Sequence, residues 1–246
     1  MRVDLAFTPP PRVSPEVTCL VVDVLRATSV MAVLFGRGLR ALWPAASIEE
    51  GRALHAALRA EGGHDGLLLL GEENAVPPAG YDYGNSPLEL QRAPAPVEVV
   101  HATTNGTPAL LACREAALVL PAAPLNAGAA VRVAMEAGRD VLVVASGLYG
   151  QRAADDTLAG GLLVQCLALA GAEPGDEALF ALEQYEAASR HFAEVLRETE
   201  HGQRLVALGF GDDVDHCAQP DLYDVAAALR IEEGRAVLRP LAGPGR

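Results

Sequence analysis

The chain has 246 residues, half of them hydrophobic, and a formal net charge of −13. This length and apolar content suffice for one large domain or two small ones with a well-filled core. The negative charge argues against nucleic acid as a partner, because such binding needs a basic face. All 19 residues counted as Lys or Arg are arginines, which excludes Schiff-base chemistry and a P-loop lysine.

The cysteines and the apolar runs exclude further classes of protein. Cys19, Cys113, Cys166 and Cys217 lie far apart with no CxxC pair, so neither a disulfide framework nor a zinc knuckle is indicated. No signal peptide and no uninterrupted membrane-spanning run is apparent. We therefore expect a cytoplasmic protein without membrane contact, and we leave a homodimer open.

Strands and helices alternate in the first part of the chain. Strands are predicted over 2–7, 19–23, 40–45 and 67–70, and helices over 27–34 and 47–61. Ser47 and Glu50 have the spacing of a capping box at the start of the second helix. A loop rich in proline and glycine follows over 74–96, and a loop of this length is usually functional or disordered.

The second part continues the alternation. Strands are predicted over 97–101, 117–121 and 141–145, and helices over 109–113, 126–137, 155–170 and 176–197, with a further short helix reaching residue 208. An acidic loop over 209–220 and a closing hairpin over 223–231 and 236–241 complete the chain. The pattern predicts an α/β fold, layered α/β/α with a mainly parallel central sheet, as one unit over 1–246 or two subdomains.

The segment from Asp23 to Ser29 joins a predicted buried strand to a helix start, which is where open α/β sheets place ligands. Asp23 offers carboxylate oxygens to a hard metal ion, and Arg26 offers a planar fork to a phosphate or sulfonate. The alternative is a salt bridge that closes the turn between strand and helix.

A second helix start follows the strand at 97–101. Thr107 suits the N-cap, Pro108 suits the first helical position, and Gly106 lets the backbone approach a ligand closely. Free N–H groups there would attract an anion, although an ordinary capped helix has the same signature. The acids Asp155 and Asp156 likewise suit either a helix dipole or a cation.

Four polar clusters come after predicted strands, over 23–28, 71–73, 103–107 and 146–150. The carboxyl ends of parallel strands share one edge of a sheet, so we expect these clusters to converge there. Carboxylates, hydroxyls, amides and one arginine suit Mg²⁺ with an anion and argue against zinc or thiol chemistry. Except for His101 at the margin of a cluster, we interpret the histidines as surface or packing residues.

The motifs taken together resemble the 2-phosphosulfolactate phosphatase family over about residues 2–240. They are Asp23-Val-Leu-Arg26-Ala-Thr28-Ser29, Gly71-Glu72, Gly84-Asn85-Ser86-Pro87, Thr103-Thr104-Asn105-Gly106-Thr107, Asn126 and Asp155-Asp156-x₃-Gly160, in this order. The resemblance implies a Mg²⁺-dependent phosphomonoesterase that converts (2R)-2-phospho-3-sulfolactate to 3-sulfolactate and phosphate. A phosphatase of another small acidic phosphoester and a non-catalytic anion-binding protein of the same fold stay open as alternatives.

The resemblance also suggests roles for single residues. The metal ligands would be Asp23, Glu72, Asp155 and Asp156, with Asp23, Arg26 and Asp156 catalytic, and Asp23 is alternatively a covalent nucleophile. Substrate contacts would come from Thr28, Asn85, Ser86, Thr104, Asn105, Gly106, Thr107, Ser146 and Gly147. The loop over 74–96 would close over the site, unless its GNSP block is only a structural turn. Arg26 is the arginine expected to bind the remaining acidic groups of the substrate. Arg152, which the resemblance does not supply, is the second candidate because it lies beside the turn at Gly150 and the two acids.

Overall fold

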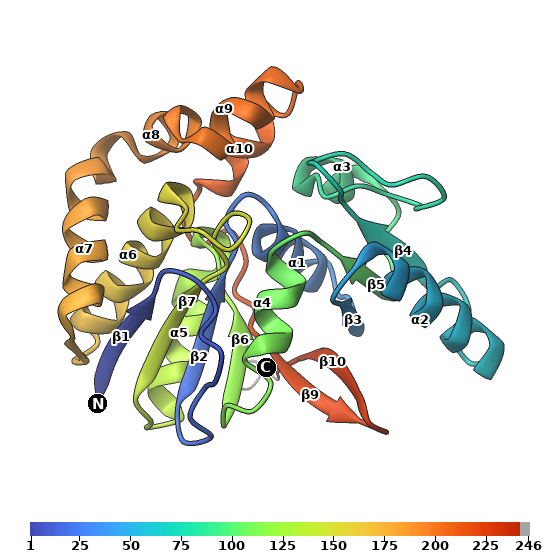
Figure 1. Ribbon diagram of the computed structural model, residues 1–246, viewed down its shortest axis with the longest axis horizontal. Coiled ribbons are helices and arrows are strands. Elements are labelled where there is room, and N and C mark those ends of the chain that lie inside the picture. Colours follow the sequence, from blue (N-terminus) through green and yellow to red (C-terminus); the bar gives the residue numbers. More distant parts are fainter. Residues whose placement is uncertain (242–246) are drawn as a thin grey trace.

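The computed structural model describes residues 1–241 and contains two five-stranded sheets (Figure 1). In the first, sheet A, every neighbouring pair of strands is parallel and the order is β6-β2-β7-β1-β8. Its strands are β1 (Arg2–Ala6), β2 (Thr18–Val22), β6 (Leu118–Pro121), β7 (Val141–Ala145) and β8 (Glu173–Pro174). Since Val22 of β2 is level with Ala145 of β7, Asp23 and Ser146 leave the sheet side by side.

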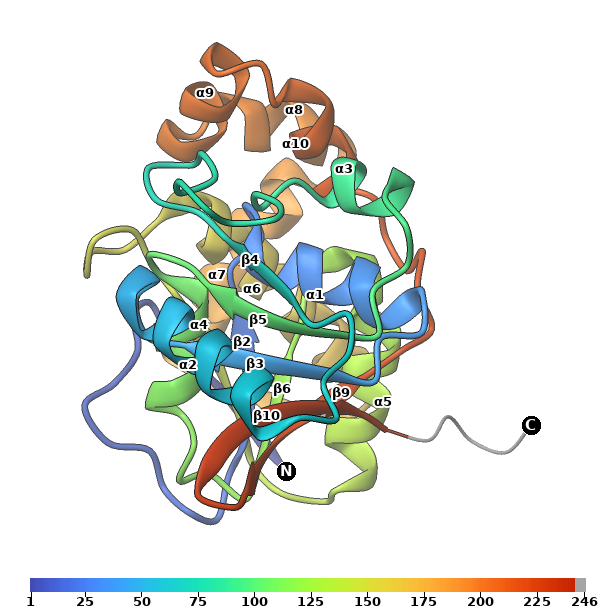
Figure 2. The same ribbon diagram turned by 90° about the vertical axis from the view of Figure 1, so that its right-hand side faces the viewer.

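The second sheet, sheet B, is mixed and has the order β4-β5-β3-β10-β9 (Figure 2). Its strands are β3 (Ala41–Ala45), β4 (Leu68–Gly71), β5 (Glu98–Ala102), β9 (Ala227–Glu232) and β10 (Arg235–Pro240). The first three are mutually parallel, whereas the hairpin of β9 and β10 joins them antiparallel through β3.

The helices form layers around these sheets. Their bounds are α1 (Ala27–Gly36), α2 (Ile48–Glu61), α3 (Pro87–Arg92), α4 (Gly106–Ala112), α5 (Ala127–Glu136), α6 (Ala154–Leu169), α7 (Asp176–Ala188), α8 (Phe192–Glu198), α9 (Glu200–Ala207) and α10 (Gly211–Cys217). Helices α5, α6 and α7 cover one face of sheet A, α1 and α4 lie between the two sheets, and α2 covers the far face of sheet B. Helices α8 to α10 lie across the top of Figure 1, beyond the carboxyl ends of the sheet A strands.

The two-residue periodicity of the strands accounts for the layering. Leu20 and Val22 of β2 pack into the core beneath α5 to α7, while Cys19 and Val21 pack against α1 on the opposite face. A strand buried on both faces has a continuous apolar sequence, as β2 does. Helix α1 is buried from Ala27 to Phe35, because protein covers it on all sides.

The predicted fold class is confirmed: sheet A is a parallel central sheet flanked by helices. The sequence pattern did not predict that the strands form two sheets. The choice between one unit over 1–246 and two subdomains stays a prediction. The capping box is confirmed in part, since the Ser47 hydroxyl accepts from the Glu50 N–H at 3.1 Å. The closing hairpin is also confirmed.

Three predicted elements are wrong. The helix over 176–197 is divided into α7 and α8 by a 3₁₀ turn at Ser189–His191. The acidic loop over 209–220 contains α10, whose Val214 and Cys217 are buried. The helix was not predicted because acids outnumber apolar residues within it. The loop over 74–96 contains α3, which Ser86 caps and Pro87 begins.

Within residues 1–241, none of the helices combines the length and the apolar character needed to cross a membrane.

Helix α6 packs against α7 through a glycine, which gives a stability prediction. A Cβ at Gly161 would lie 2.1 Å from the backbone oxygen of Ala181, so the two helices would have to separate. We expect Gly161→Ala to lower the free energy of unfolding by about 1–3 kcal/mol, the usual cost of overpacking, despite the better helix propensity of alanine. Urea unfolding measures this difference.

The control is Gly160→Ala in the same helix. Its Cβ would meet the end of the Leu5 side chain at 2.8 Å, and that side chain can shift. Equal stability of the two variants would contradict the packing argument.

Candidate active site

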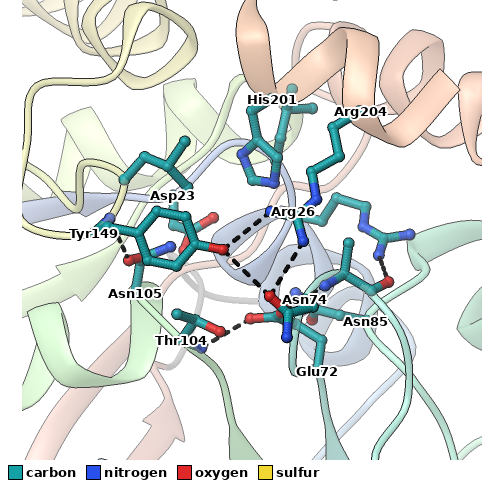
Figure 3. Close-up of a pocket in the computed structure, with 13 residues that line it drawn as sticks. Asp23, Arg26, Glu72, Asn74, Asn85, Thr104, Asn105, Tyr149, His201 and Arg204 are labelled. Atoms are coloured by element: carbon teal, nitrogen blue, oxygen red, sulfur yellow. Dashed lines mark hydrogen bonds between the residues drawn. The ribbon is translucent and has the colours of Figure 1, made fainter. Parts of the chain in front are cut away.

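A cleft opens at the carboxyl ends of β2, β4 and β5, below α9 (Figure 3). It is lined by Asp23, Leu25, Arg26, Glu72, Asn74, Ala75, Asn85, Thr104, Asn105, Leu148, Tyr149, His201 and Arg204. Residues from all four predicted polar clusters, which are far apart in the sequence, therefore line one cleft.

Asp23 follows β2 directly and is held by the start of α1. Its Oδ1 accepts from the Ala27 N–H at 3.2 Å, and its backbone N–H donates to the Thr28 hydroxyl at 3.1 Å. Among the described residues nothing donates to its Oδ2. A Cβ at Gly106 would lie 2.6 Å from that oxygen, so glycine is needed for the TTNGT block to come this close to the carboxylate.

The carboxylate of Asp23 lies in an acidic environment. Burial raises its pKa to about 6; the charge of His201 and the hydrogen bond from Ala27 lower it, and the charges of Glu72 and Asp155 raise it. A buried acid with such a perturbed pKa in a cleft is typical of a functional site.

Glu72 fastens two loops at the cleft. Its Oε1 accepts from the Thr104 N–H and its Oε2 from the Ala75 N–H, both at 2.8 Å. Each oxygen retains a further lone pair, since a carboxylate offers about four acceptor sites.

The adjacent acids Asp155 and Asp156 have different partners. Asp156 is buried and accepts from the Val24 N–H at 2.9 Å, the Ser146 hydroxyl at 2.7 Å and the Gly147 N–H at 3.0 Å. Burial, followed by the charges of Asp155 and Asp23, raises its pKa well above the ordinary value. It joins the ends of β2 and β7 but is absent from the cleft lining over residues 1–241.

Asp155 instead contacts α9, where its Oδ2 lies 3.2 Å from Nδ1 of His201. Burial alone would lower the pKa of His201, but the hydrogen bond with Asp155 and the charges of Asp155, Asp23 and Glu72 raise it. The raised pKa favours the positively charged form of His201 in a cleft that contains two acids.

The four predicted metal ligands do not form one preassembled cluster. Within residues 1–241, no three side chains of His, Cys, Asp or Glu are close enough together to hold an ion. Asp23 and Glu72 both line the cleft, whereas Asp155 pairs with His201 and Asp156 is bonded behind the cleft. Two carboxylates with hard oxygens remain for a cation.

Arg26 lines the cleft, but both of its terminal nitrogens have partners in the protein. Nη1 donates to Oδ2 of Asp213 at 2.7 Å, Nη2 donates to the Ala75 carbonyl at 2.8 Å, and the guanidinium lies over the Phe210 ring. Arg26 and Asp213 are 2% and 3% exposed, which makes this a buried ion pair. A two-pronged contact of Arg26 with substrate is not available in this arrangement, and its catalytic role stays a prediction.

The predicted substrate-binding residues fall into two groups. Asn85, Thr104 and Asn105 line the cleft, and Gly106 lies beside Asp23. The others bond within the protein: the side chains of Thr28, Ser86, Thr107 and Ser146 bond to Asp23, Asp213, Thr103 and Asp156 respectively, and the backbone N–H of Gly147 donates to Asp156.

Two details of these blocks differ from the prediction. Helix α4 begins at Gly106 with Asn105 as its N-cap, so Thr107 is inside the helix, where its hydroxyl accepts from the Thr103 N–H at 2.9 Å. The Asn85 side chain bonds to His101 Nε2 at 3.0 Å. Anion binding at the start of α4 stays a prediction.

The predicted site residues did not include four polar residues of the cleft lining. His201 and Arg204 come from α9, Tyr149 from the turn after β7, and Asn74 from the loop after β4. The spacing of His201 and Arg204 places both on one face of a helix, which is the one sequence signal for them. His201, which the sequence indicated as a surface or packing residue, lies in the lining of the cleft.

His101 gives a prediction about pH. Burial lowers its pKa to about 3, and its Nδ1 has no partner among the described residues, so the ring is neutral in the folded protein. In the unfolded chain it binds a proton below about pH 6.5. Its contribution to stability is therefore complete above pH 6.5 and is lost toward pH 3, at up to about 1.4 kcal/mol per pH unit.

His101→Gln removes this titration, and the side-chain amide of glutamine can still donate to Asn85. We measure the free energy of unfolding by denaturant unfolding between pH 4 and 6. In the variant its slope against pH should be flatter by an amount that corresponds to about one fewer proton bound on unfolding. An unchanged slope would contradict the neutral buried ring.

The buried ion pair gives a second prediction. Asp213→Asn keeps an acceptor for Ser86 but leaves the Arg26 guanidinium buried without its carboxylate, which should cost about 3–5 kcal/mol of unfolding free energy. Asp212→Asn, at the exposed neighbouring position, is the control. The double variant Arg26→Met/Asp213→Asn should regain part of the loss, and equal stability of the Asp212 and Asp213 variants would contradict a stabilising pair.

Comparison with known proteins gives a single family. The family model described as 2-phosphosulpholactate phosphatase matches residues 8–231. A protein of Carboxydothermus hydrogenoformans named probable 2-phosphosulfolactate phosphatase is 33% identical over 240 residues, which cover 97% of each chain. Proteins of the same name are 37% identical over 243 residues in Gloeobacter violaceus and 33% identical over 213 residues in Thermotoga petrophila.

These relatives match the chain over nearly its whole length. The Gloeobacter protein covers 97% of this chain with 98% of its own, and the Thermotoga protein covers 86% with 88%. The match includes every segment that contributes to the cleft. The chain therefore belongs to the 2-phosphosulpholactate phosphatase family and is a phosphoric monoester hydrolase of that family.

Proposed function

We propose that this chain hydrolyses 2-phospho-3-sulfolactate to 3-sulfolactate and phosphate, with Mg²⁺ as its cofactor. The observation that carries the proposal is the convergence of Asp23, Glu72 and the Thr104-Asn105 pair in one cleft at the ends of three strands. The names of the relatives support the substrate.

The charges at the cleft suit a small polyanion. The ester has about four negative charges at neutral pH, and the protein, at −13, repels it over long range. Local cations must therefore provide binding, and with no lysine in the chain these are arginine, histidine and a metal ion. The cleft contains Arg204 and the histidine whose pKa Asp155 raises, His201.

The donor set fits Mg²⁺. This ion is usually bound through one or two carboxylates together with waters and substrate phosphate oxygens, so a protein cluster of three ligands is not needed. Asp23 and Glu72 would hold it, and bound there it would neutralise charge on the phosphoryl oxygens. Asp23 suits this role because its buried carboxylate lies among acids and its Oδ2 has no donor among residues 1–241.

The other side chains of the cleft would bind and orient the ester. His201 is held through Nδ1 by Asp155, and its Nε2, which has no hydrogen-bond partner among residues 1–241, would donate to a phosphoryl or leaving-group oxygen. The amides of Asn85 and Asn105 and the Thr104 hydroxyl are neutral donors at the same cleft. In the hydrolysis the oxygen of water bonds to phosphorus, the bond from phosphorus to the ester oxygen breaks, and that oxygen takes up a proton.

Asp23 has a second possible role as a covalent nucleophile, which would attack phosphorus through its free Oδ2. Both roles require the carboxylate. Trapping a phosphoenzyme distinguishes them, because only the nucleophile forms an acyl phosphate.

The test is phosphate release from synthetic 2-phospho-3-sulfolactate and from a panel of phosphorylated hydroxy acids, with and without chelator and added Mg²⁺. We expect Asp23→Asn, which keeps the shape of the side chain, to lower kcat/KM at least about 100-fold, the scale of removing one preorganised electrostatic contact at the reacting group. Asp65→Asn at an exposed position is the control and should keep full activity.

Two results would contradict the proposal. If the wild-type protein releases no phosphate from any ester although phosphate raises its melting temperature, the fold serves anion binding without catalysis. If Asp23→Asn turns over at the wild-type rate, the cleft is not the reaction centre.

A further inference from the structure

Three side chains from separate segments meet above the cleft (Figure 3). Arg204 of α9 donates through Nη1 to the Tyr149 hydroxyl at 3.0 Å and through Nη2 to Oδ1 of Asn74 at 3.2 Å. The Tyr149 hydroxyl is also 3.4 Å from that Asn74 oxygen, and the Tyr149 N–H donates to Oδ1 of Asn105 at 3.2 Å. The guanidinium is thus held at the mouth of the cleft from two sides.

Arg204 differs in charge balance from the other arginine of the cleft. Arg26 is neutralised by Asp213 at 2.7 Å, whereas over residues 1–241 Arg204 has only neutral hydrogen-bond acceptors and forms no ion pair. Its positive charge is therefore not paired with a carboxylate among these residues, and it faces a cleft predicted to receive an anion. Asn74 and Tyr149 are exposed. If a ligand oxygen replaces their side-chain oxygens on the guanidinium, water can bond to those oxygens, so no polar group is left buried without a partner.

We propose that Arg204 is the residue that recognises the sulfonate of the substrate, held in position by Tyr149 and Asn74. This inference rests on the proposed function. A guanidinium presents a planar fork that can donate two parallel hydrogen bonds to an oxyanion, and a sulfonate offers three oxygens and stays ionised.

The layout of the substrate favours the sulfonate over the carboxylate as the partner of Arg204. The phosphoryl group belongs with Asp23 and Glu72, which follow the strands, while Arg204 is on the helix that covers the cleft. The sulfur is one bond farther from phosphorus than the carboxylate carbon is. The sulfonate is therefore the group that reaches the mouth when the phosphoryl group lies at the strand ends.

The arginines expected from sequence are engaged elsewhere. Arg152 lies between the rings of Phe7 and Phe180, at 4.2 and 4.3 Å from their centroids, and it is absent from the cleft lining among the described residues. Arg26 pairs with Asp213. Arg204 is thus the cleft arginine whose fork is free to exchange its neutral partners for an anion.

The test compares two esters that differ only in the sulfonate, 2-phospho-3-sulfolactate and 2-phospholactate. Arg204→Met should lower kcat/KM for the sulfonated ester roughly 10- to 150-fold, the equivalent of 1.5–3 kcal/mol for a hydrogen bond to a charged group. For 2-phospholactate the change should be under about 3-fold. Arg190→Met, which removes an exposed arginine from the same helical layer, is the control for net charge.

Calorimetric titration with 3-sulfolactate gives a second readout that does not depend on turnover. Binding should weaken by a similar factor in Arg204→Met and stay unchanged in Arg190→Met. Tyr149→Phe retains the charge but loses one positioning contact, so its loss should be smaller than that of Arg204→Met and again limited to sulfonated ligands.

The outcomes separate this inference from the proposed function. Equal losses on both esters, or unchanged binding of 3-sulfolactate in Arg204→Met, overturn the role of Arg204 while hydrolysis by the wild type stands. If the wild type hydrolyses neither ester but binds 3-sulfolactate through Arg204, the proposed function fails and the sulfonate site stands.

Discussion

The buried ion pair between Arg26 and Asp213 connects the start of α1 to α10. Arg26 is the N-cap residue of α1, and it also bonds to the loop after β4 through the Ala75 carbonyl. Asp213 accepts from Ser86 at 2.8 Å and from the Leu88 N–H at 3.3 Å, which attaches the start of α3 to α10. Because α10 packs against α9, the pair fixes the helix that carries His201 and Arg204 above the strand ends.

This constraint gives the cleft an asymmetric distribution of charge. The strand ends supply Asp23 and Glu72, and α9 supplies His201 and Arg204. Burying Asp23 near other acids is costly, which its raised pKa of about 6 reflects, and such strain is expected where a protein binds or reacts rather than where it only folds. A phosphoryl group with a cation would sit between the two sides and balance both.

The sequence predicted the parts of the site whose signal is local. The apolar runs of β2 and β7 and the polar residues after them identified the edge of sheet A, and residues 103–107, which follow β5 of sheet B, contribute to the same cleft. Long-range pairing leaves no such signal. A salt bridge was the alternative expected for Arg26, yet its partner is Asp213, a residue within a segment whose acids suggested a loop. Asp155 and Asp156 are neighbours in sequence, but one faces α9 and the other joins two strands.

The most direct test of this account is a crystal structure of the protein with Mg²⁺ and 3-sulfolactate. We expect the ion on the carboxylates of Asp23 and Glu72, and the sulfonate on the guanidinium of Arg204 in place of Tyr149 or Asn74. The account would be contradicted by product bound outside this cleft, or by a sulfonate on Arg26 with the Asp213 pair broken.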